Sequence, residues 1–516
     1  MPGAISLISI ASFDIPHVFP EAALSEAAAA GPIDAAGRAD LRDLDLVTID
    51  GSDARDFDDA VWAEPDGDPA NAGGWHLIVA IADVAHYVTP GRALDAEARE
   101  RGNSVYFPDR VVPMLPEALS NGLCSLKPKE DRACLVARLW IDRDGRKRKH
   151  QFERAIMRST ARFTYEEVQA ARDGGKRLPI SKARLDALYE AFAALDRARS
   201  ARGALALDLI EYRVVLDARG TPVAVEPRQR LDSHKLIEEF MILANVAAAE
   251  ELEARRRACL YRVHDAPAPD RLDMLRDALA DIDVPGLGLA KGQVIRPELF
   301  NRILTRVAGR PEAPVVNDLV LRAQAQAVYS PHNIGHFGLA LQRYAHFTSP
   351  IRRYADLLVH RALLGESLTV EELEAIGRHV SATERQAAAA ERAALERYRA
   401  QLLSSRIGEV FAARVSGVQR YGLFITLAEI GADGLLPIAG LPPDFYRFDP
   451  RKMRLSGRHS RRSFGLGDAV SARLVEADPI GGRLVFRLDE AETERPRREP
   501  PRRHGRPGRQ VRPRRH

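Results

Sequence analysis

The chain of 516 residues contains little cysteine, and this scarcity limits both the kinds of cysteine site and the compartments that fit the sequence. Its three cysteines, Cys124, Cys134 and Cys259, form no CxxC pair, so the sequence indicates neither a zinc framework nor a redox pair. An odd and low number of cysteines in a chain of this length is typical of a reducing compartment. We therefore expect a cytoplasmic protein.

Long apolar runs are also missing. The best one, Leu77–Ala85, is interrupted by Asp83 and is far shorter than the roughly 20 residues of a transmembrane helix. The first residues, MPGAISLISIASFDI, lack the basic and apolar regions of a secretory signal. We expect no membrane partner. Hydrophobic residues still make up 45% of the chain and charged residues 29%, as in globular proteins, and the length predicts roughly three domains.

Net charge is nearly absent, only +4 at pH 7, but the charges are unevenly spread. Residues 40–68 carry eleven acidic side chains against two basic ones. Residues 447–462 carry seven basic side chains against one acidic, and residues 491–516 carry ten arginines against three acids. One acidic cluster and two basic clusters indicate a metal site and a polyanionic partner.

Apolar patterns divide the chain into strands and helices. From Leu41 onward, short apolar runs separated by turn residues predict strands, and CLVARLWID, residues 134–142, predicts another. Apolar residues at helical spacing predict helices over 233–255, 351–364 and 370–405.

This division predicts an α+β protein in four parts. Residues 1–40 are a lead-in segment without strong periodicity, and residues 41–405 are a central domain of strands and surrounding helices. Residues 406–489 alternate short strands with Gly turns, as a small five-stranded OB barrel does. Residues 490–516 are rich in Arg and Pro, and we expect a disordered tail that adds salt-sensitive affinity for nucleic acid or only keeps the protein soluble.

The acidic cluster contains the string TIDGSDARDFDDAV, residues 48–61. Several carboxylates that converge on one spot cannot all stay ionised without a cation. Mg²⁺ binds carboxylate, water and phosphate oxygens, and a pair of such ions can promote phosphodiester cleavage. A solvated acidic turn is the alternative, but the strand-forming residues between the aspartates disfavour it.

A second constellation lies in YSPHNIGHFGLALQRYAHFTSPIRRYAD, residues 329–356. Thr348 or Ser349 can cap the helix predicted over 351–364, and Pro350 suits its first turn, which would also contain Arg352 and Arg353. Cations gain nothing from the helix dipole there, so we expect both arginines to hold phosphate. Aromatic residues alternate with the arginines as on surfaces that bind single strands, although core aromatics beside a solvated arginine face are the alternative.

From about Asp40 to Asp489 the chain resembles the ribonuclease II and ribonuclease R (RNB) exoribonuclease family, with the closer likeness to ribonuclease R. The strings that carry the resemblance are TIDGSDARDFDDAV, SVYFPDRVVPMLPEALSNGLCSLKPKEDR, HKLIEEFMILANVAAAE, YRVHDAP and YSPHNIGHFGLALQRYAHFTSPIRRYADLLVHR. The fold that it implies is an RNB catalytic domain followed by an S1-like OB barrel.

The resemblance implies a processive 3′→5′ exoribonuclease that releases nucleoside 5′-monophosphates with Mg²⁺, or alternatively Mn²⁺. The expected partners are 3′ ends of single-stranded RNA and structured RNA with a 3′ overhang, and we expect a monomer. By motif position the catalytic and metal-binding carboxylates are Asp50, Asp56, Asp58 and Asp59. Because all four are present, the sequence disfavours an RNA-binding protein with a weakened catalytic domain. A metal phosphohydrolase acting on DNA is a further alternative.

The resemblance also implies RNA contacts. Tyr106 matches the aromatic that stacks on the 3′-terminal base, and Tyr165 matches the tyrosine that grips the last nucleotides and sets the length of the final product. Glu238 matches an acid at the terminal nucleotides, and Arg352 matches the catalytic arginine on the scissile phosphate.

Further RNA contacts are expected from Arg353, beside Arg352, and from Tyr421 and Phe424 of the barrel, next to the basic loop 447–462. Core packing is the alternative for Phe424, because the pattern GLFIT does not settle which of its residues face inward.

The sequence departs from the family in two respects. The family carries one or two cold-shock OB domains before the catalytic motifs, whereas about forty residues precede them here, so we expect a short form or a start that lies further upstream. The second aromatic of the base clamp should fall within RGALALDLIEY, but Ala206 and Leu207 stand there, and we expect a one-sided clamp.

Overall fold

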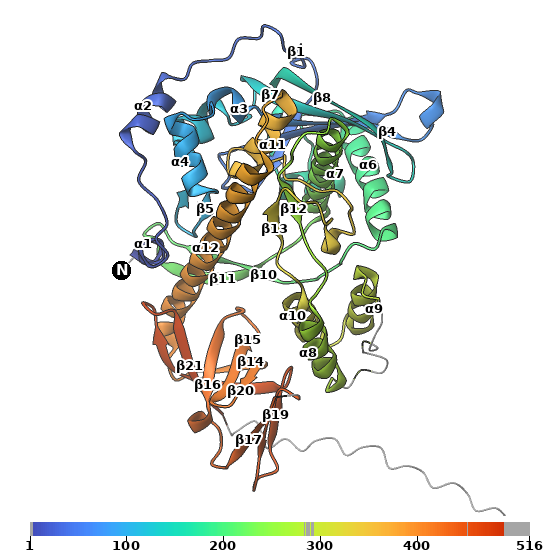
Figure 1. The fold of residues 1–516 in the computed structure, drawn as a ribbon. Coiled ribbons are helices and arrows are strands. Elements are labelled where there is room, and N and C mark those ends of the chain that lie inside the picture. Colours follow the sequence, from blue (N-terminus) through green and yellow to red (C-terminus); the bar gives the residue numbers. More distant parts are fainter. Residues whose placement is uncertain (1–3, 283, 285–288, 290–293, 451, 490–516) are drawn as a thin grey trace, which may run out of the picture.

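The computed structural model describes residues 4–282, 284, 289, 294–450 and 452–489 (Figure 1). Its centre is a seven-stranded mixed sheet in the upper half of the view. In spatial order the strands are β1 (Ala39–Asp40), β8 (Lys147–Arg158), β7 (Asp131–Ile141), β4 (Trp75–Ala82), β3 (Asp59–Pro65), β2 (Val47–Asp50) and β9 (Ala161–Thr164). The outer pairs, β1 with β8 and β2 with β9, are parallel, and the inner pairs are antiparallel. Together with the surrounding helices, the mixed sheet confirms the α+β prediction.

Strand β4 explains the longest apolar run of the sequence. Leu77, Val79 and Ile81 fill the core on one face of the sheet, whereas Ile78 and Ala80 fill the core on the other. A central strand that is covered on both faces needs apolar side chains at nearly every position. Among the described residues, no helix is long and apolar enough to cross a membrane.

Helices cover both faces of the sheet. One face packs against α5 (Tyr165–Arg172), α6 (Lys182–Ala201) and α7 (Asp232–Ala254). The other packs against α4 (Ala93–Arg101) and the first half of α12 (Val370–Leu403), while α11 (Tyr354–Leu364) contributes to both cores. The helices predicted over 233–255 and 370–405 are therefore present with nearly the same ends.

Helix α12 connects three regions of the molecule. Its 34 residues extend about 50 Å at 1.5 Å per residue. Ile376 packs beneath the sheet, Ala390 and Ala394 pack against the N-terminal segment, and Ala400 and Leu403 enter the core of the barrel. Figure 1 shows this helix running from the sheet down to the barrel. One continuous helix thereby joins the sheet-containing part of the molecule to the barrel.

The lead-in segment has more structure than its weak periodicity indicated. It forms α1 (Ala4–Ser12), which lies against α12, and α2 (Glu21–Ala29), which lies against α4. The buried residues are Ile5, Ser6, Ser9 and Ile10 in α1 and Ala23 and Ala27 in α2. Because all of them except the two isoleucines are small or polar, the packed faces do not produce a strong apolar pattern in the sequence.

Smaller elements surround this framework. Helices α8 (Pro269–Ala280), α9 (Pro297–Val307) and α10 (Ala313–Ala323) pack around a core of their own. A long hairpin of β10 (Glu211–Leu216) and β11 (Pro222–Arg228) crosses between the sheet and the barrel in Figure 1. The remaining short elements are α3 (Val84–Tyr87) and the pairs β5 (Val105–Tyr106) with β6 (Val111–Val112) and β12 (Tyr261–Val263) with β13 (Val328–Ser330).

The C-terminal module is a closed barrel, as predicted. Its strands follow the order β14 (Val410–Gln419), β15 (Gly422–Leu427), β16 (Asp433–Pro437), β21 (Arg483–Leu488) and β20 (Ala469–Asp478). Between β16 and β20 the chain forms a separate antiparallel sheet of β17 (Tyr446–Asp449), β18 (Arg454–Gly457) and β19 (Ser463–Gly465), which we call the ribbon. The predicted tail, residues 490–516, lies outside the described residues.

Candidate active site

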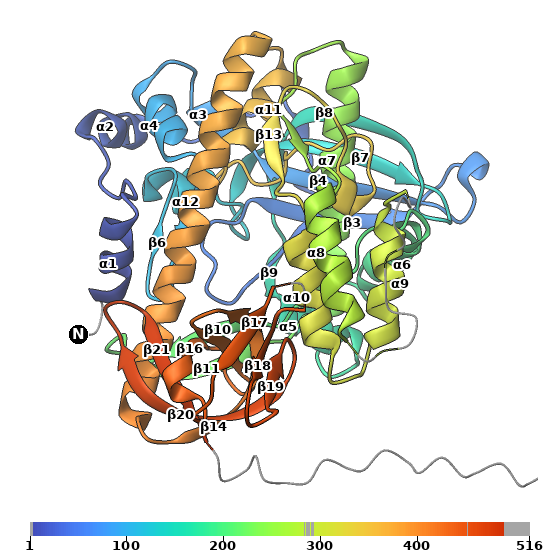
Figure 2. The same cartoon turned by 60° about the horizontal axis from the view of Figure 1, so that its bottom comes forward.

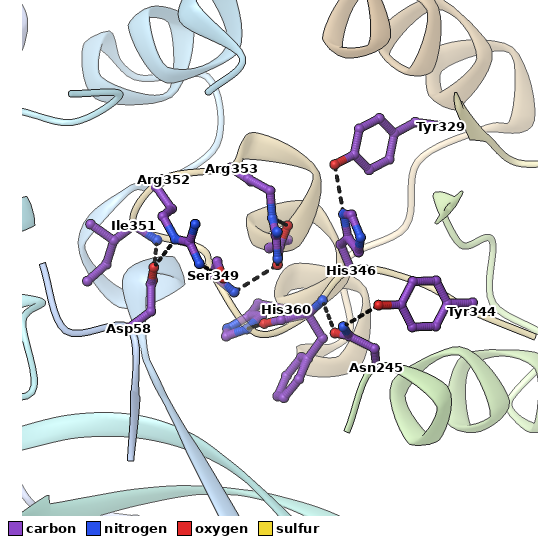
Figure 3. A network of polar contacts seen from close by, with 12 residues as sticks. Asp58, Asn245, Tyr329, Tyr344, His346, Ser349, Ile351, Arg352, Arg353 and His360 are labelled. Atoms are coloured by element: carbon purple, nitrogen blue, oxygen red, sulfur yellow. Dashed lines mark hydrogen bonds and ion pairs between the residues drawn. The ribbon is translucent and has the colours of Figure 1, made fainter. Parts of the chain in front are cut away.

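The acidic string forms the end of β2, a loop and the start of β3. Asp50 is the last residue of β2 and Asp59 is the first of β3, so the turn between two paired strands brings the aspartates together. Asp58 is only 3% exposed. Its Oδ1 accepts a hydrogen bond from the backbone N–H of Ile351 at 2.9 Å, and its Oδ2 accepts one from Arg352 Nε at 3.1 Å (Figure 3). The acidic cluster and the second constellation therefore meet at one carboxylate.

Burial and mutual repulsion disturb these carboxyl groups. Burial raises the pKa of Asp58 to about 8, and the charge of Arg352 only partly offsets it. The pKa of Asp50 is also raised, first by burial and then by the charge of Asp58, and the pKa of Asp59 is raised first by burial and then by the charge of Asp50. A cation at this point would favour the ionised forms of all three groups.

The residues fit a divalent ion in chemistry but do not form a complete ligand set as they stand. Among the described residues, no three His, Cys, Asp or Glu side chains lie in an arrangement that could hold a metal ion. Asp56 accepts the hydroxyl of Tyr106, and both oxygens of Asp58 are engaged as described. Oδ2 of Asp50, by contrast, is buried without a hydrogen-bond partner among the described residues. An all-oxygen donor set with an unsatisfied buried carboxylate suits Mg²⁺ or Mn²⁺.

One edge of the Arg352 guanidinium is hydrogen-bonded within the protein, and the other edge is accessible to solvent. Its Nε donates to Asp58, and its Nη2 donates to the hydroxyl of Ser349 at 3.0 Å. The side chain remains 43% exposed. A guanidinium with five N–H donors in a fixed plane, fixed on one side and accessible on the other, is suited to hold a phosphate.

Helix α11 begins at Tyr354, three residues after the predicted start, so the prediction that Arg352 and Arg353 lie in its first turn was wrong. Arg353 has extended backbone angles and forms an isolated β-bridge with Asn103. The backbone N–H of Ser104 donates to the carbonyl of Arg352, and the N–H of Tyr354 donates to that of Gly102. This pairing with residues 102–104 keeps the two arginines out of the helix and sets Arg352 beside Asp58.

Arg353 supports this turn from behind. Its Nε and Nη2 each donate to Asp356 at 2.8 Å, and Asp356 also accepts the backbone N–H of Ser349 at 2.8 Å. The Asp356 side chain is fully buried. The structure therefore gives Arg353 a positioning role through Asp356, and its predicted contact with RNA stays a prediction.

A polar network continues from this turn into the core (Figure 3). His346 Nδ1 lies 2.8 Å from the hydroxyl of Tyr329, and Asn245 on α7 donates to the hydroxyl of Tyr344. The Oδ1 atom of Asn245 accepts the backbone N–H of Phe347 at 2.7 Å. Every contact ties the segment before Arg352 to another element, which keeps the arginine in place.

Tyr106 lies at the edge of the acidic cluster. The side chain is 39% exposed, and its hydroxyl donates to Asp56 Oδ2 at 2.9 Å. Its backbone N–H donates to Glu391 on α12 at 2.7 Å. Nothing in the sequence singled out Glu391, because it is one of many charged residues on a long helix. An exposed aromatic ring beside the carboxylates is the arrangement that base stacking requires.

Tyr165 is the first residue of α5 and packs against α7. Its ring stacks on that of His234, with 4.0 Å between ring centroids and 18° between planes. The hydroxyl of Ser233 donates to the Tyr165 carbonyl at 2.8 Å. Burial, and after it the charge of nearby Arg228, lowers the pKa of His234 and so favours the neutral imidazole. The sequence did not single out His234 as a candidate residue, although it is the first residue of the string HKLIEE.

Glu238 lies one turn further along α7 and is engaged by two arginines. It accepts a hydrogen bond from Arg199 at 3.0 Å and pairs with Arg230. The neighbouring Glu239 is nearly buried and pairs with Arg199 and Arg202. Contact between Glu238 and RNA would therefore involve this arginine pair as well.

Tyr421 and Phe424 belong to the barrel, whereas the carboxylates belong to the seven-stranded sheet and its β2–β3 loop. Both rings are exposed and form an edge-to-face pair with 6.2 Å between centroids. The alternative of core packing for Phe424 is therefore wrong, because Leu423 and Ile425 point inward instead. In the region of the expected second clamp aromatic, Leu207 packs against the core of α8–α10.

Comparison with known proteins agrees with this architecture. Residues 38–365 match the RNB domain family. Ribonuclease R of Escherichia coli is 41% identical over 94% of this chain, which spans 62% of that relative's length. The structure of Mycoplasma genitalium RNase R with ribose-methylated single-stranded RNA matches with a TM-score of 0.88 at 31% identity, over 94% of this chain and 77% of that chain.

A second structure of the Mycoplasma genitalium enzyme, in complex with double-stranded RNA, matches with a TM-score of 0.82 at 29% identity, over 94% of this chain and 82% of that chain. The matched residues include the aspartate string, the second constellation and the connecting sheet. The chain belongs to the RNB domain family, and within it the sequence is similar to ribonuclease R.

Proposed function

We propose that this chain is a processive 3′→5′ exoribonuclease that hydrolyses RNA to nucleoside 5′-monophosphates. The observation that carries the proposal is the contact of Asp58 with both Ile351 N–H and Arg352. This contact joins a cluster of carboxylates to an exposed phosphate-binding side chain. The likeness to ribonuclease R supplies the direction of cleavage.

With this function we assign residues 41–405 to an RNB catalytic domain. We assign residues 406–489 to an S1-like RNA-binding domain. The barrel topology and the exposed aromatic pair support an RNA-binding role for the second part. OB barrels bind single strands through stacking aromatics and basic grooves.

Asp50, Asp56, Asp58 and Asp59 would hold Mg²⁺ or Mn²⁺, and the unsatisfied Oδ2 of Asp50 supports this assignment. When bound, such an ion supplies an activated water and stabilises charge on the leaving oxygen. Around it, the residues of the chain have separate tasks. Asp58 orients Arg352, and the open edge of Arg352 binds the scissile phosphate and stabilises the charge that develops there.

The aromatic residues position the end of the strand. Tyr106 stacks on the terminal base without regard to sequence, which contributes about 1–3 kcal/mol. Tyr165, backed by His234, grips the last nucleotides and limits how short the product becomes. Contacts to the 2′-hydroxyl would exclude DNA.

The deciding experiment uses RNA labelled at its 5′ end and the DNA strand of the same sequence, each incubated with the protein in Mg²⁺. We expect a ladder that shortens from the 3′ end on RNA alone, ending at a short limit product, and no reaction after EDTA. Circular RNA should stay intact. Cleavage of the DNA, or cuts inside the circle, would contradict the exonuclease function, and binding without any cleavage would favour a weakened catalytic domain.

Structured RNA with a 3′ overhang is the further substrate that we propose, since the Mycoplasma genitalium homologue has been solved with double-stranded RNA. A labelled duplex with and without an overhang tests this, and only the overhang duplex should be degraded. We also propose a monomer in the cytoplasm. The three cysteines, all buried and free, support the reducing compartment.

A further inference from the structure

The ribbon β17–β19 has two different faces. Residues that lie directly opposite one another share a face, and Phe448, Leu455 and Phe464 form such a row. These three side chains pack on the barrel core. The next row, Arg447, Ser456 and Ser463, therefore points away from the barrel. The outer face is polar because the inner face takes up the apolar residues.

The tip of the ribbon is an ordered turn rather than a loose loop. The carboxylate of Asp444 accepts hydrogen bonds from the backbone N–H groups of Phe445, His459 and Ser460 and from the Ser460 hydroxyl, at 2.6–3.1 Å. These donors hold the pKa of Asp444 well below its usual range. An ionised carboxylate thus fixes the turn that follows β18.

Exposed cations and an exposed aromatic ring surround this turn. Arg447, Arg458 and Arg461 are exposed. The ring of Phe445 is 78% exposed, with the ring of His459 at 6.5 Å between centroids. Three cations around an open aromatic ring match the chemistry of single-stranded RNA, in which phosphates and bases alternate. An acidic protein would satisfy the cations but would leave the ring without a partner.

We propose that the outer face and tip of the ribbon form a second RNA-binding surface, with Arg447, Arg458 and Arg461 on phosphates and Phe445 stacked on a base. The proposal rests on the function proposed above only in naming RNA as the partner. Figure 1 places the ribbon at the end of the molecule opposite β7 and β8, and Figure 2 shows it in front, beside the barrel strands. The ribbon belongs to the C-terminal module and not to the sheet that carries the carboxylates, so we assign it to nucleotides upstream of the 3′ end.

The test measures equilibrium binding of fluorescent RNA in EDTA, which prevents degradation. Two lengths are compared, about 6 and about 24 nucleotides, because one OB fold covers roughly 4–16 nucleotides. The test variant combines Arg447→Ala, Arg458→Ala and Arg461→Ala. The control variant, with the same loss of charge, combines Arg148→Ala, Arg219→Ala and Arg385→Ala, three exposed arginines on β8, the β10–β11 turn and α12.

For the longer RNA, the ribbon variant should bind about tenfold more weakly or worse at 0.1 M salt, and the slope of log affinity against log salt should fall by about 2. The control variant should lose much less affinity for the longer RNA. Both variants should bind the short RNA with the same affinity. Phe445→Ala should weaken binding of the longer RNA about fivefold or more without a change in slope.

Asp444→Ala tests whether RNA binding depends on the ordered structure of the ribbon tip or only on its net charge. Net charge alone predicts tighter RNA binding after this substitution, because a negative charge is removed. The proposal predicts weaker binding, because the cations and Phe445 lose their fixed arrangement. Tighter binding would therefore overturn the ordered tip.

The surface itself is contradicted if the ribbon variant binds both lengths as the control does. It is also contradicted if that variant loses affinity for polyglutamate but not for RNA, which would indicate an acidic protein partner. If the unaltered chain binds RNA but does not degrade it in Mg²⁺, the proposed exonuclease function fails while the ribbon surface stands. If it binds no RNA, both fail.

Discussion

The Nε atom of Arg352 lies 3.1 Å from Oδ2 of Asp58, although the two residues are 294 positions apart in the chain. The same carboxylate accepts the backbone N–H of Ile351. This one side chain therefore fixes the distance between the carboxylate cluster and the arginine that would bind phosphate. Removing its charge should affect chemistry more than RNA affinity.

Asp58→Asn tests this expectation. The new amide can still accept from Ile351 N–H, but it brings no negative charge to Arg352 or to a metal ion. We expect cleavage of RNA to fall about 10²–10³-fold or more, with little change in RNA affinity measured in EDTA. Asp53→Asn, at an exposed position in the same string, is the matched control and should keep full activity. Undiminished cleavage by the Asp58→Asn variant would show that the carboxylate site is misassigned.

Arg352→Lys and Arg353→Lys should separate two neighbouring roles. Lysine keeps the charge but cannot form the double hydrogen bond that Arg353 makes with buried Asp356. Arg353→Lys should therefore lower the free energy of unfolding by about 1–3 kcal/mol. Arg352→Lys should change stability by less than about 1 kcal/mol and lower kcat about 100-fold. Urea denaturation and single-turnover kinetics give the two readouts. Equal stability losses in both variants would remove the distinction.

Tyr106 should act through its ring more than through its hydroxyl. Tyr106→Ala should weaken binding of the RNA 3′ end by about 1–3 kcal/mol, the value of one stacked base. Tyr106→Phe removes only the hydrogen bond to Asp56 and should weaken binding of the RNA 3′ end by about 0.5–1.5 kcal/mol. Affinities for an RNA with a blocked 3′ end in EDTA compare the three proteins. A phenylalanine variant as weak as the alanine variant would place the role in the hydroxyl instead.

His234 should control the final product through Tyr165. His234→Ala removes the ring on which Tyr165 stacks, a contact of about 0.5–1.5 kcal/mol. We expect a broader range of limit products, resolved on a sequencing gel. His234→Phe restores a flat ring and should restore the single product length, whereas a purely destabilising effect would leave the product length unchanged in both variants.

Asp83 should make stability depend on acid pH. Its buried carboxylate pairs with Arg38 at 2.7 Å and Arg154 at 2.8 Å, and these arginines lower its pKa even though burial opposes the shift. A lowered folded-state pKa contributes stability that is complete above the unfolded value of about 3.9 and is lost as the pH falls through the folded value. Asp83→Asn should therefore lower the free energy of unfolding by about 3–5 kcal/mol at pH 7.

Urea denaturation at several pH values checks this prediction. The difference between the variant and the unaltered chain should shrink below about pH 4. Asp186→Asn is the matched control, since Asp186 forms an exposed ion pair with Lys182. Its effect should be about 0–1 kcal/mol. A constant difference down to the acid limit of the fold would contradict the role of ionised Asp83.

Local patterns in the sequence predicted much of the secondary structure. The apolar run Leu77–Ala82 forms part of a strand, the helices near 233–255 and 370–405 form with nearly the expected ends, and the Gly-punctuated strands of 406–489 close into a barrel. These elements depend on the spacing of apolar residues, which is a property of neighbouring positions. The aspartate and arginine strings also marked the candidate site before any contact was known.

Contacts between distant segments decided the rest. Helix α11 begins at Tyr354 because residues 352–354 pair with residues 102–104, and no local pattern contains that information. Phe424 points outward because Leu423 and Ile425 fill the barrel core. The alternating pattern alone does not decide this, because a shift of one residue exchanges the inward and outward side chains. The sequence by itself thus determined the elements and the chemical groups that they carry. Only tertiary packing placed Asp58 against Arg352, Tyr165 on His234 and Arg447 on the outer face of the ribbon.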